Sequence, residues 1–218
     1  LQFPGTNCEY DTKYAFEQLG CEVEIIWHKE KTIPVDTELL VIPGGFSYGD
    51  YLRSGAIARF ADIMDSVQEY AANGGKVLGI CNGFQILLEA GLLPGAMKRN
   101  DSLHFISKYH TLKVINTDNK FLSLMKRDEI VNIPVAHHDG NYYIDANGLK
   151  ELEDNNQILL KYCDKDGNLV NMNGSISNIA GICNKQKNVF GLMPHPERAI
   201  ETILGSTDGV NMLKGFLQ

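Results

Sequence analysis

The chain has 218 residues, of which 44% are hydrophobic and 22% are charged. That length suggests one large domain or two small ones, and that composition excludes a disordered tail, a coiled coil and a collagen-like repeat. Acidic residues outnumber basic ones by 27 to 20, and the resulting net charge of −7 disfavours general binding to nucleic acid or anionic lipid. The longest apolar runs fall far short of the roughly 20 residues that a membrane span needs. We therefore expect neither nucleic acid nor membrane as a partner.

The first half of the chain alternates helical and strand-like patterns. It opens on Leu1, and we expect it to begin inside a first strand that is incomplete. Such alternation is typical of an α/β protein with an open, mostly parallel sheet and helices on both of its faces. In chain order the patterns predict a helix over 10–19, strands over 21–27 and 39–42, a polar loop over 46–55, a helix over 57–70, a strand over 76–80 and a helix over 84–90.

The second half is mostly strand-like, with turn signals such as Asp166-Gly167 between several strands. We expect these strands to be antiparallel additions to the same sheet, followed by a helix from about Val210. No linker or repeat separates the two halves, so a single domain over 1–218 is predicted. The expected strands cover 112–115, 130–135, 158–162, 179–183 and 189–193.

The five cysteines are an odd number, are widely spaced and include no C-x-x-C pair. This pattern argues against a disulfide framework or a zinc site and favours a reducing compartment, the cytoplasm. His137, His138 and Asp139 are adjacent, but neighbouring residues on one strand point to opposite faces, so no metal is expected there. One of the thiols remains free to be catalytic. The cysteines are Cys8, Cys21, Cys81, Cys163 and Cys183.

The strongest local signal is the segment Gly79-Ile80-Cys81-Asn82-Gly83-Phe84-Gln85. It places a thiol where a buried strand ends and a helix begins, with glycines two residues before and after it. This is the sulfur counterpart of the Gly-x-Ser-x-Gly nucleophile elbow. The N–H groups and partial positive charge of the helix N-terminus favour a reactive thiolate. The alternative is a small, buried, apolar cysteine at a strand end.

The same four residue types recur in Gly181-Ile182-Cys183-Asn184. Polar residues and another strand follow them, which predicts a hairpin. Cys183 therefore lacks a helix behind it, and Cys81 is the preferred nucleophile.

The second signal is Pro194-His195-Pro196-Glu197, which follows an apolar strand. Pro196 disfavours helical geometry at His195, and extended residues two apart point the same way. Glu197 can then reach the His195 ring and hold its tautomer. A plain surface turn is the alternative for this segment taken alone, but combined with the elbow it predicts a Cys-His-Glu triad.

The third signal is Pro43-Gly44-Gly45-Phe46-Ser47, which follows a short buried strand. Glycines there leave backbone N–H groups able to face a substrate oxygen. We expect the N–H of Gly45 or Phe46, together with that of Asn82, to form an oxyanion hole. A plain glycine-rich turn is the alternative, and no phosphate-binding motif follows.

Together, the elbow at Cys81 and the late His195-Pro196-Glu197 resemble the class I (triad) glutamine amidotransferases, whose fold is flavodoxin-like. Within that class the chain is similar to the glutaminase subunits of phosphoribosylformylglycinamidine synthases, over nearly its whole length. The segments that carry this narrower resemblance are Gly44 to Arg53, Glu89 to Gly95, Asn173-Gly174-Ser175 and Met193 to Arg198.

The resemblance implies that Cys81 attacks the side-chain amide of glutamine, that His195 shuttles the proton and that Glu197 orients His195. Gln85, Gly44 and His137 would help to hold the glutamine. Ammonia would pass to a large synthetase subunit that uses ATP and Mg²⁺ to make the amidine of purine biosynthesis, and a small bridging subunit would complete the complex. No cofactor is expected in this chain itself.

One segment departs from the family pattern. Residues 136–140 read Ala-His-His-Asp-Gly where the family has Ala-His-Gly-Glu-Gly, so only His137 takes a role from the resemblance, and none is assigned to His138 or Asp139. Two other classes stay open on the residues alone. One is a different Cys-His-Glu α/β hydrolase, peptidase-like or deglycase-like, and the other is a non-catalytic binding module.

Overall fold

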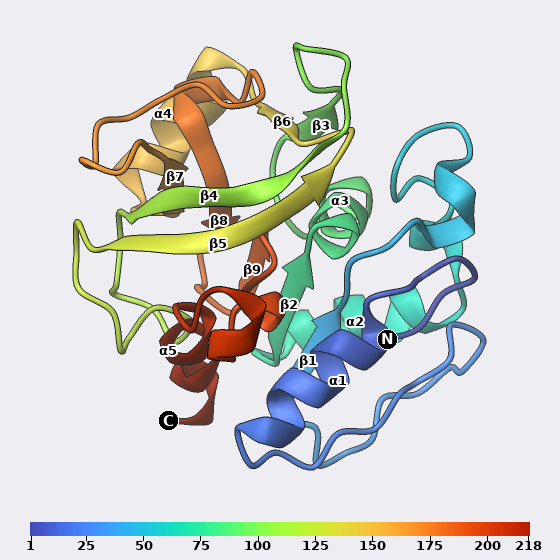
Figure 1. Cartoon of the computed structure of the whole chain (residues 1–218). Coiled ribbons are helices and arrows are strands. Elements are labelled where there is room, and N and C mark those ends of the chain that lie inside the picture. Colours follow the sequence, from blue (N-terminus) through green and yellow to red (C-terminus); the bar gives the residue numbers. More distant parts are fainter.

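The fold is built around a seven-stranded mixed sheet with the order β1-β2-β9-β8-β7-β4-β5, beside a separate two-stranded sheet of β3 and β6 (Figure 1). The computed structural model describes all residues from 1 to 218. The strands are β1 Leu39–Ile42, β2 Lys76–Ile80, β3 Ala96–Lys98, β4 Ile106–Val114, β5 Ile130–His137, β6 Asn141–Tyr143, β7 Ile158–Tyr162, β8 Ile179–Cys183 and β9 Val189–Leu192.

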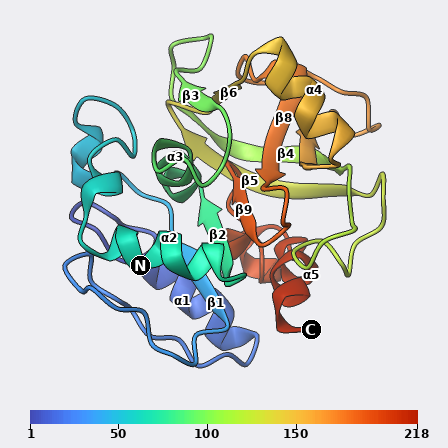
Figure 2. The ribbon, with the colours of Figure 1, turned by 180° about the vertical axis from the view of Figure 1, so that it is seen from behind.

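Helices cover both faces of the parallel part of the sheet. Figure 1 shows α1 in front of β1, whereas α2 and α3 come to the front in the reverse view of Figure 2. β2 is buried on both faces, which explains its continuous apolar pattern. No helix has both the length and the apolar character to cross a membrane. The helices are α1 Glu9–Gln18, α2 Ile63–Ala72, α3 Asn82–Glu89, α4 Ala146–Asp154 and α5 Gly209–Lys214.

The α/β class and the antiparallel additions are confirmed, but the parallel part of the sheet is smaller than expected. Only the pairs β1–β2 and β2–β9 run parallel. The other four pairings, from β9 through β8, β7 and β4 to β5, are antiparallel. β7 and β8 have apolar patterns like those of parallel strands because they too are almost wholly buried. Burial on both faces therefore does not by itself reveal strand direction.

Three predicted elements differ from the structure. The expected first strand at Leu1 and the strand over 21–27 are both absent, because these two segments share only a single parallel bridge between Gln2 and Trp27. The helix predicted over 57–70 begins at Ile63, after a 3₁₀ turn at Ala58–Phe60. Ala61 between these two elements has extended backbone angles, which interrupt the helical path.

The antiparallel half of the sheet curls towards the end of β2. The β4–β5 pair passes in front of β8 in Figure 1 and lies behind it in Figure 2. As a result, the Sγ atom of Cys81, just after β2, lies 3.6 Å from the carbonyl oxygen of Ala136 near the end of β5. The segment after β9 joins them, since the N–H of His195 donates to the carbonyl of Pro134 at 2.8 Å. Three strand ends therefore meet at one place.

The close approach of α3 to β1 gives a stability prediction. A side-chain carbon at Gly83 would lie 1.8 Å from the carbonyl oxygen of Ile42, and no rotamer change relieves a clash with backbone. We expect Gly83→Ala to lower the free energy of unfolding by about 3 kcal/mol. The matched control is Gly20→Ala, because Gly20 has positive φ but open space around it, and it should cost about 1 kcal/mol. Urea denaturation of both variants checks this, and equal shifts in midpoint would contradict the packing argument.

Candidate active site

Cys81 occupies the turn between β2 and α3, where the sequence predicts it. Its backbone angles, φ 51° and ψ −106°, are rare for a residue other than glycine and cost on the order of 1–3 kcal/mol. The side chain is 5% exposed and lies beside the N-terminus of α3. The N–H of Asn82, the first residue of that helix, has no acceptor within the protein. The turn thus presents a thiol next to an unused backbone donor.

Cys183 offers an internal comparison. It ends β8, is completely buried, and is followed by a turn that leads into the antiparallel strand β9. The hairpin expected there is confirmed, so no helix N-terminus supports this thiol. Cys183 also lies away from the cavity described below.

His195 and Glu197 form a buried pair just after β9. The Nδ1 atom of His195 lies 2.6 Å from Oε1 of Glu197, and both side chains are 2% exposed or less. The predicted geometry is wrong in one respect, because Pro196–Arg198 is a 3₁₀ turn and not an extended segment. Pro196 suits the first position of this turn, which folds the carboxylate back towards the ring. The pair forms by a tight turn and not by alternation along a strand.

The charges around His195 favour its protonated ring. Burial opposes protonation, but the charges of Glu197 and Cys81 outweigh it and raise the pKa of His195 to about 10. A side-chain carbon at Gly44 would lie 2.7 Å from Cε1 of His195 and 3.4 Å from Cβ of Cys81. The ring and the cysteine therefore flank the same glycine. The Nε2 atom of His195 has no partner within the protein and is available for proton transfer.

The glycine-rich loop after β1 supplies one of its two predicted donors. The N–H of Phe46 donates to the carbonyl of Gly5 at 3.1 Å, so it is engaged within the protein. The N–H of Gly45 has no acceptor there. Gly44 lies beside His195 and is not among the residues that line the cavity, and its contact with glutamine stays a prediction. Of the three predicted oxyanion donors, Gly45 and Asn82 remain available.

A cavity of about 290 Å³ opens over Cys81 and suits a small polar ligand. Gln85 lines it but uses both ends of its amide within the protein. Its Oε1 accepts from the side chain of Asn82 at 2.8 Å, and its Nε2 donates to the carbonyl of Asp139 at 2.6 Å. Gln85 therefore ties the start of α3 to the segment that follows β5.

His137, the last residue of β5, lines the same cavity and is 3% exposed. The Oδ1 atom of Asn100 accepts from the N–H of Gly140 and lies 3.1 Å from Nδ1 of His137. Because that oxygen can only accept, Nδ1 carries the proton and Nε2 keeps its lone pair. Burial, and next the charge of His195, lower the pKa of His137 to about 4, so the ring is neutral at pH 7. Its Nε2 is a buried acceptor with no partner in the protein.

Two carboxylates near the mouth of the cavity are residues that the sequence reasoning missed as site residues. Asp50 and Asp139 both line it, and the hydroxyl of Ser54 donates to Asp139 at 2.9 Å. Burial, and next the charge of Asp139, raise the pKa of Asp50 to about 6. Asp50 stands in the polar loop and Asp139 after β5. The two segments are far apart in the sequence, so no local pattern predicts that both residues line one cavity.

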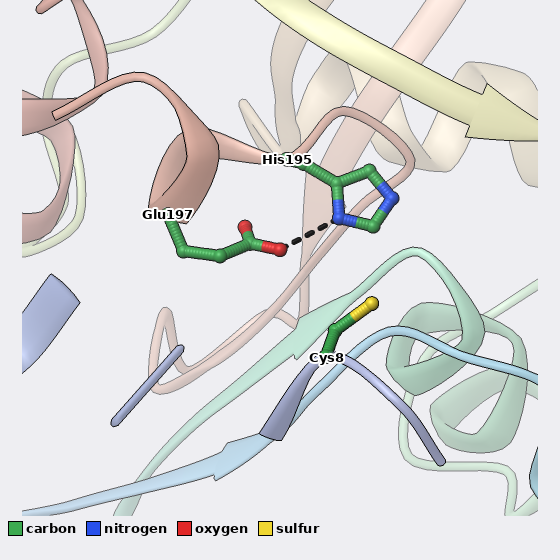
Figure 3. A group of neighbouring side chains, drawn as sticks. All are labelled: Cys8, His195 and Glu197. Atoms are coloured by element: carbon green, nitrogen blue, oxygen red, sulfur yellow. Dashed lines mark hydrogen bonds and ion pairs between the residues drawn. The ribbon is translucent and has the colours of Figure 1, made fainter. Parts of the chain in front are cut away.

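Cys8 was also missed, and it brings a second thiol beside His195. Figure 3 shows it with His195 and Glu197, and the donor atoms of the three lie within 4.8 Å of one another. The set resembles zinc ligands, but a guanidinium nitrogen of Arg198 lies 3.2 Å from the Cys8 sulfur and would repel a metal ion. Burial raises the pKa of Cys8 to about 12, so it stays a neutral thiol next to the pair.

Comparisons with known proteins agree with this geometry. Residues 1–210 match the family model of the CobB/CobQ-like glutamine amidotransferase domain. The phosphoribosylformylglycinamidine synthase subunit PurQ of Sulfurimonas denitrificans is 70% identical over 218 residues, which cover 100% of this chain and 97% of that protein. The PurQ subunit of Wolinella succinogenes is 62% identical over 216 residues, with 99% and 97% covered.

Solved structures give the same result. The structure of PurLQS from Thermotoga maritima superposes with a TM-score of 0.88 at 41% identity, covering 99% of this chain and 94% of that one. A putative GMP synthase protein from Thermoplasma acidophilum, at 16% identity, shares the fold with a TM-score of 0.64 and coverage of 98% and 88%. The chain therefore belongs to the class I glutamine amidotransferases, in the family of PurQ glutaminase subunits of phosphoribosylformylglycinamidine synthase.

Proposed function

We propose that Cys81 is the nucleophile of the glutaminase reaction and that His195 and Glu197 complete its catalytic triad. The Cys81 thiolate attacks the side-chain carbonyl carbon of glutamine, and the oxyanion accepts from the N–H groups of Gly45 and Asn82. His195 then gives its proton to the leaving nitrogen, so the C–N bond breaks, ammonia departs and a thioester forms. Water attacks the thioester, His195 takes up the water's proton, and glutamate and the thiolate are released.

One observation carries this proposal. His195, which makes the buried 2.6 Å contact with Glu197, and Cys81, which stands in the strained turn, both lie next to Gly44. The contact fixes the proton of His195 on Nδ1 when the ring is neutral, which leaves Nε2 able to accept. Gln85 and His137 are proposed to shape the glutamine site, Gln85 by positioning the loops and His137 through its unpaired Nε2. Gly44 makes room for the ring. Because the family is one of glutaminases, the peptidase-like, deglycase-like and non-catalytic alternatives lose their support.

We further propose that the whole chain is one amidotransferase domain that works in a complex. Its ammonia passes to a larger synthetase subunit, which binds the ATP and Mg²⁺ of the second reaction, and a small bridging subunit completes the assembly. The relationship to PurLQS of Thermotoga maritima supports this organisation. The odd number and wide spacing of the cysteines support the cytoplasm as the compartment.

Cysteine labelling tests the nucleophile. We expect 6-diazo-5-oxo-L-norleucine, an electrophilic analogue of glutamine, to label Cys81 in the complex, as located by peptide mass spectrometry. Cys81→Ala should abolish glutamine-dependent synthesis and leave ammonia-dependent synthesis intact, since the synthetase reaction needs only ammonia. Cys183→Ser is the matched control and should retain labelling and activity. Labelling of Cys8 or Cys183 in place of Cys81 would overturn the assignment.

The charge of Glu197 predicts a pH effect. His195 must be protonated to expel ammonia, and with its pKa raised to about 10 that proton is lost only as the pH rises through this range. Glu197→Gln removes a charge that holds the pKa up, so the alkaline limb of kcat/KM should move to lower pH. Profiles of the complex from pH 6 to 11 measure the shift. An alkaline limb at the same pH in both proteins would show that Glu197 does not act on His195 electrostatically.

Partner binding should raise the glutaminase rate. In this structure Phe46 donates to Gly5 and not into the site, while Tyr48, Asp50 and Leu52 in the same loop all have positive φ. We expect the synthetase subunit to align the loop and its oxyanion donors, and so to raise kcat for glutamine at least tenfold over the isolated chain. Coupled glutamate assays with and without the partner subunits measure this ratio. Equal rates would refute partner activation.

A further inference from the structure

A second thiol lies beside the buried pair of His195 and Glu197, and the reaction steps above do not use it. Cys8 stands just before α1, is 3% exposed and is not among the residues that line the cavity over Cys81. Figure 3 shows its side chain pointing towards the ring of His195, and its sulfur is one of the three donor atoms that lie within 4.8 Å of one another. This thiol is therefore shielded from solvent but adjacent to the reacting groups.

Cys8 and Cys81 flank the same glycine. A side-chain carbon at Gly44 would lie 3.2 Å from the sulfur of Cys8 and 3.4 Å from Cβ of Cys81. Because both distances are measured to one point, the Cys8 sulfur and the Cβ of Cys81 cannot be farther apart than their sum. Gly44 has no side chain to separate the two cysteines. A disulfide between them therefore needs only side-chain rotations and a small shift of the loop that carries Cys8.

Neither sulfur is held in its present position by a strong hydrogen bond. The Cys81 sulfur lies 3.6 Å from the carbonyl oxygen of Ala136, which is a long contact for a weak donor. The Cys8 sulfur lies 3.2 Å from Oδ1 of Asn7 and 3.2 Å from a guanidinium nitrogen of Arg198. The attraction between a Cys81 thiolate and the protonated His195 ends when the sulfur is oxidised to a neutral group. Oxidation therefore frees the Cys81 side chain to rotate.

The cavity gives a small oxidant access to Cys81 and not to the other buried thiols. Cys81 lines this cavity, whereas Cys8 does not, and Cys163 and Cys183 are completely buried. Peroxides react with thiolates much faster than with thiols, and the N-terminus of α3 together with the protonated ring of His195 favours the thiolate of Cys81. A peroxide that enters the cavity therefore meets the reactive sulfur of Cys81 first.

The surroundings of Cys8 delay its reaction until Cys81 has been oxidised. Burial raises the pKa of Cys8 to about 12, the charge of Arg198 opposes this, and the negative charge of Cys81 is among the causes that raise it. A sulfenic acid at Cys81 is neutral, so its formation removes that negative charge. The guanidinium of Arg198 remains 3.2 Å from the Cys8 sulfur and favours its thiolate. Cys8 therefore becomes the better nucleophile after its neighbour has been oxidised.

We propose that Cys8 is a resolving thiol, which converts Cys81 oxidised by a peroxide into a reversible Cys8–Cys81 disulfide. In the first step the Cys81 thiolate attacks one oxygen of hydrogen peroxide, the O–O bond breaks, and His195 protonates the leaving hydroxide to give water. In the second step the Cys8 sulfur attacks the sulfur of the sulfenic acid and the S–O bond breaks. His195 takes the proton of Cys8 and gives it to the leaving hydroxyl group, which departs as a second water. Peroxide gains two electrons, formally one from each sulfur.

The disulfide protects the nucleophile and stops the glutaminase reaction at the same time. The inference rests on the proposed function, because it requires Cys81 to be the reactive thiolate of the site. A sulfenic acid that meets no second thiol is oxidised further to a sulfinic acid, which dithiols do not reduce. The disulfide prevents this loss, and it blocks attack on glutamine until a dithiol regenerates the two thiols.

Peptide mass spectrometry of the whole complex tests the disulfide. After hydrogen peroxide treatment and blocking of free thiols, we expect a peptide pair linked through Cys8 and Cys81 and a loss of glutamine-dependent synthesis, both reversed by dithiothreitol. In Cys8→Ser and Cys8→Ala, Cys81 should gain two oxygen atoms instead. The activity that dithiothreitol restores, relative to each untreated variant, should fall about fivefold. Cys183→Ser is the matched control and should behave like the wild type, and ammonia-dependent synthesis measures any damage to the synthetase subunit.

Three results would overturn the proposal. They are a sulfinic acid at Cys81 of the wild type while Cys8 stays a free thiol, a disulfide from Cys81 to another cysteine, and equal recovery of activity in the wild type and the Cys8 variants. The linkage is read from peptide masses and does not depend on glutaminase activity. If Cys81→Ala retains glutaminase activity, the proposed function fails, whereas a linked pair in the wild type still shows that Cys8 resolves an oxidised Cys81.

Discussion

A carboxylate and an imidazole lie almost out of water, joined by the 2.6 Å contact between Glu197 and His195. Burial alone would lower the pKa of the ring, so its protonated form exists there only because Glu197 and Cys81 compensate the charge. The other features of the site follow from this constraint. The Cys81 thiol must lie close enough to His195 to compensate part of the charge of the ring. The side chains around the pair must exclude water, and no bulky side chain can stand between the ring and the thiol. Gly44, flanked by His195 and Cys81, satisfies the last of these conditions.

The curled sheet brings the necessary groups together. β2 delivers Cys81, the segment after β9 delivers His195, and the end of β5 closes the cavity through Ala136 and His137. In a flat parallel sheet β5, five strands away from β2 in the order, would lie far from the thiol. The antiparallel strands therefore complete the site. They are also the reason why less of the sheet is parallel than the sequence predicts.

The sequence predicts the placement of Cys81, His195 and Glu197 in one candidate site because each belongs to a short motif whose geometry is local. The elbow is a strand, a turn and a helix within a few residues, and the His195–Glu197 pair spans one turn. Sequence reasoning failed where contact depends on the curl of the sheet or on loop packing. Cys8 lies in a loop with no motif of its own, and the Gly44 to Arg53 segment carries the resemblance without assigning a role to Asp50. The occupied N–H of Phe46 depends on the distant Gly5. The sequence of residues 21–27 likewise does not reveal that this segment forms only a single bridge, between Trp27 and Gln2.

The cavity combines two electrostatic environments that do different work. At its base, a thiolate and an imidazolium can neutralise each other, which favours chemistry at a neutral amide. At its mouth, Asp50, Asp139 and Arg99 line the opening, where the Arg99 side chain is 72% exposed. Placing the mutually repelling acids at the base would raise the pKa of His195 further and hinder its proton release. Keeping these acids at the mouth of the cavity therefore leaves the proton transfer at its base undisturbed.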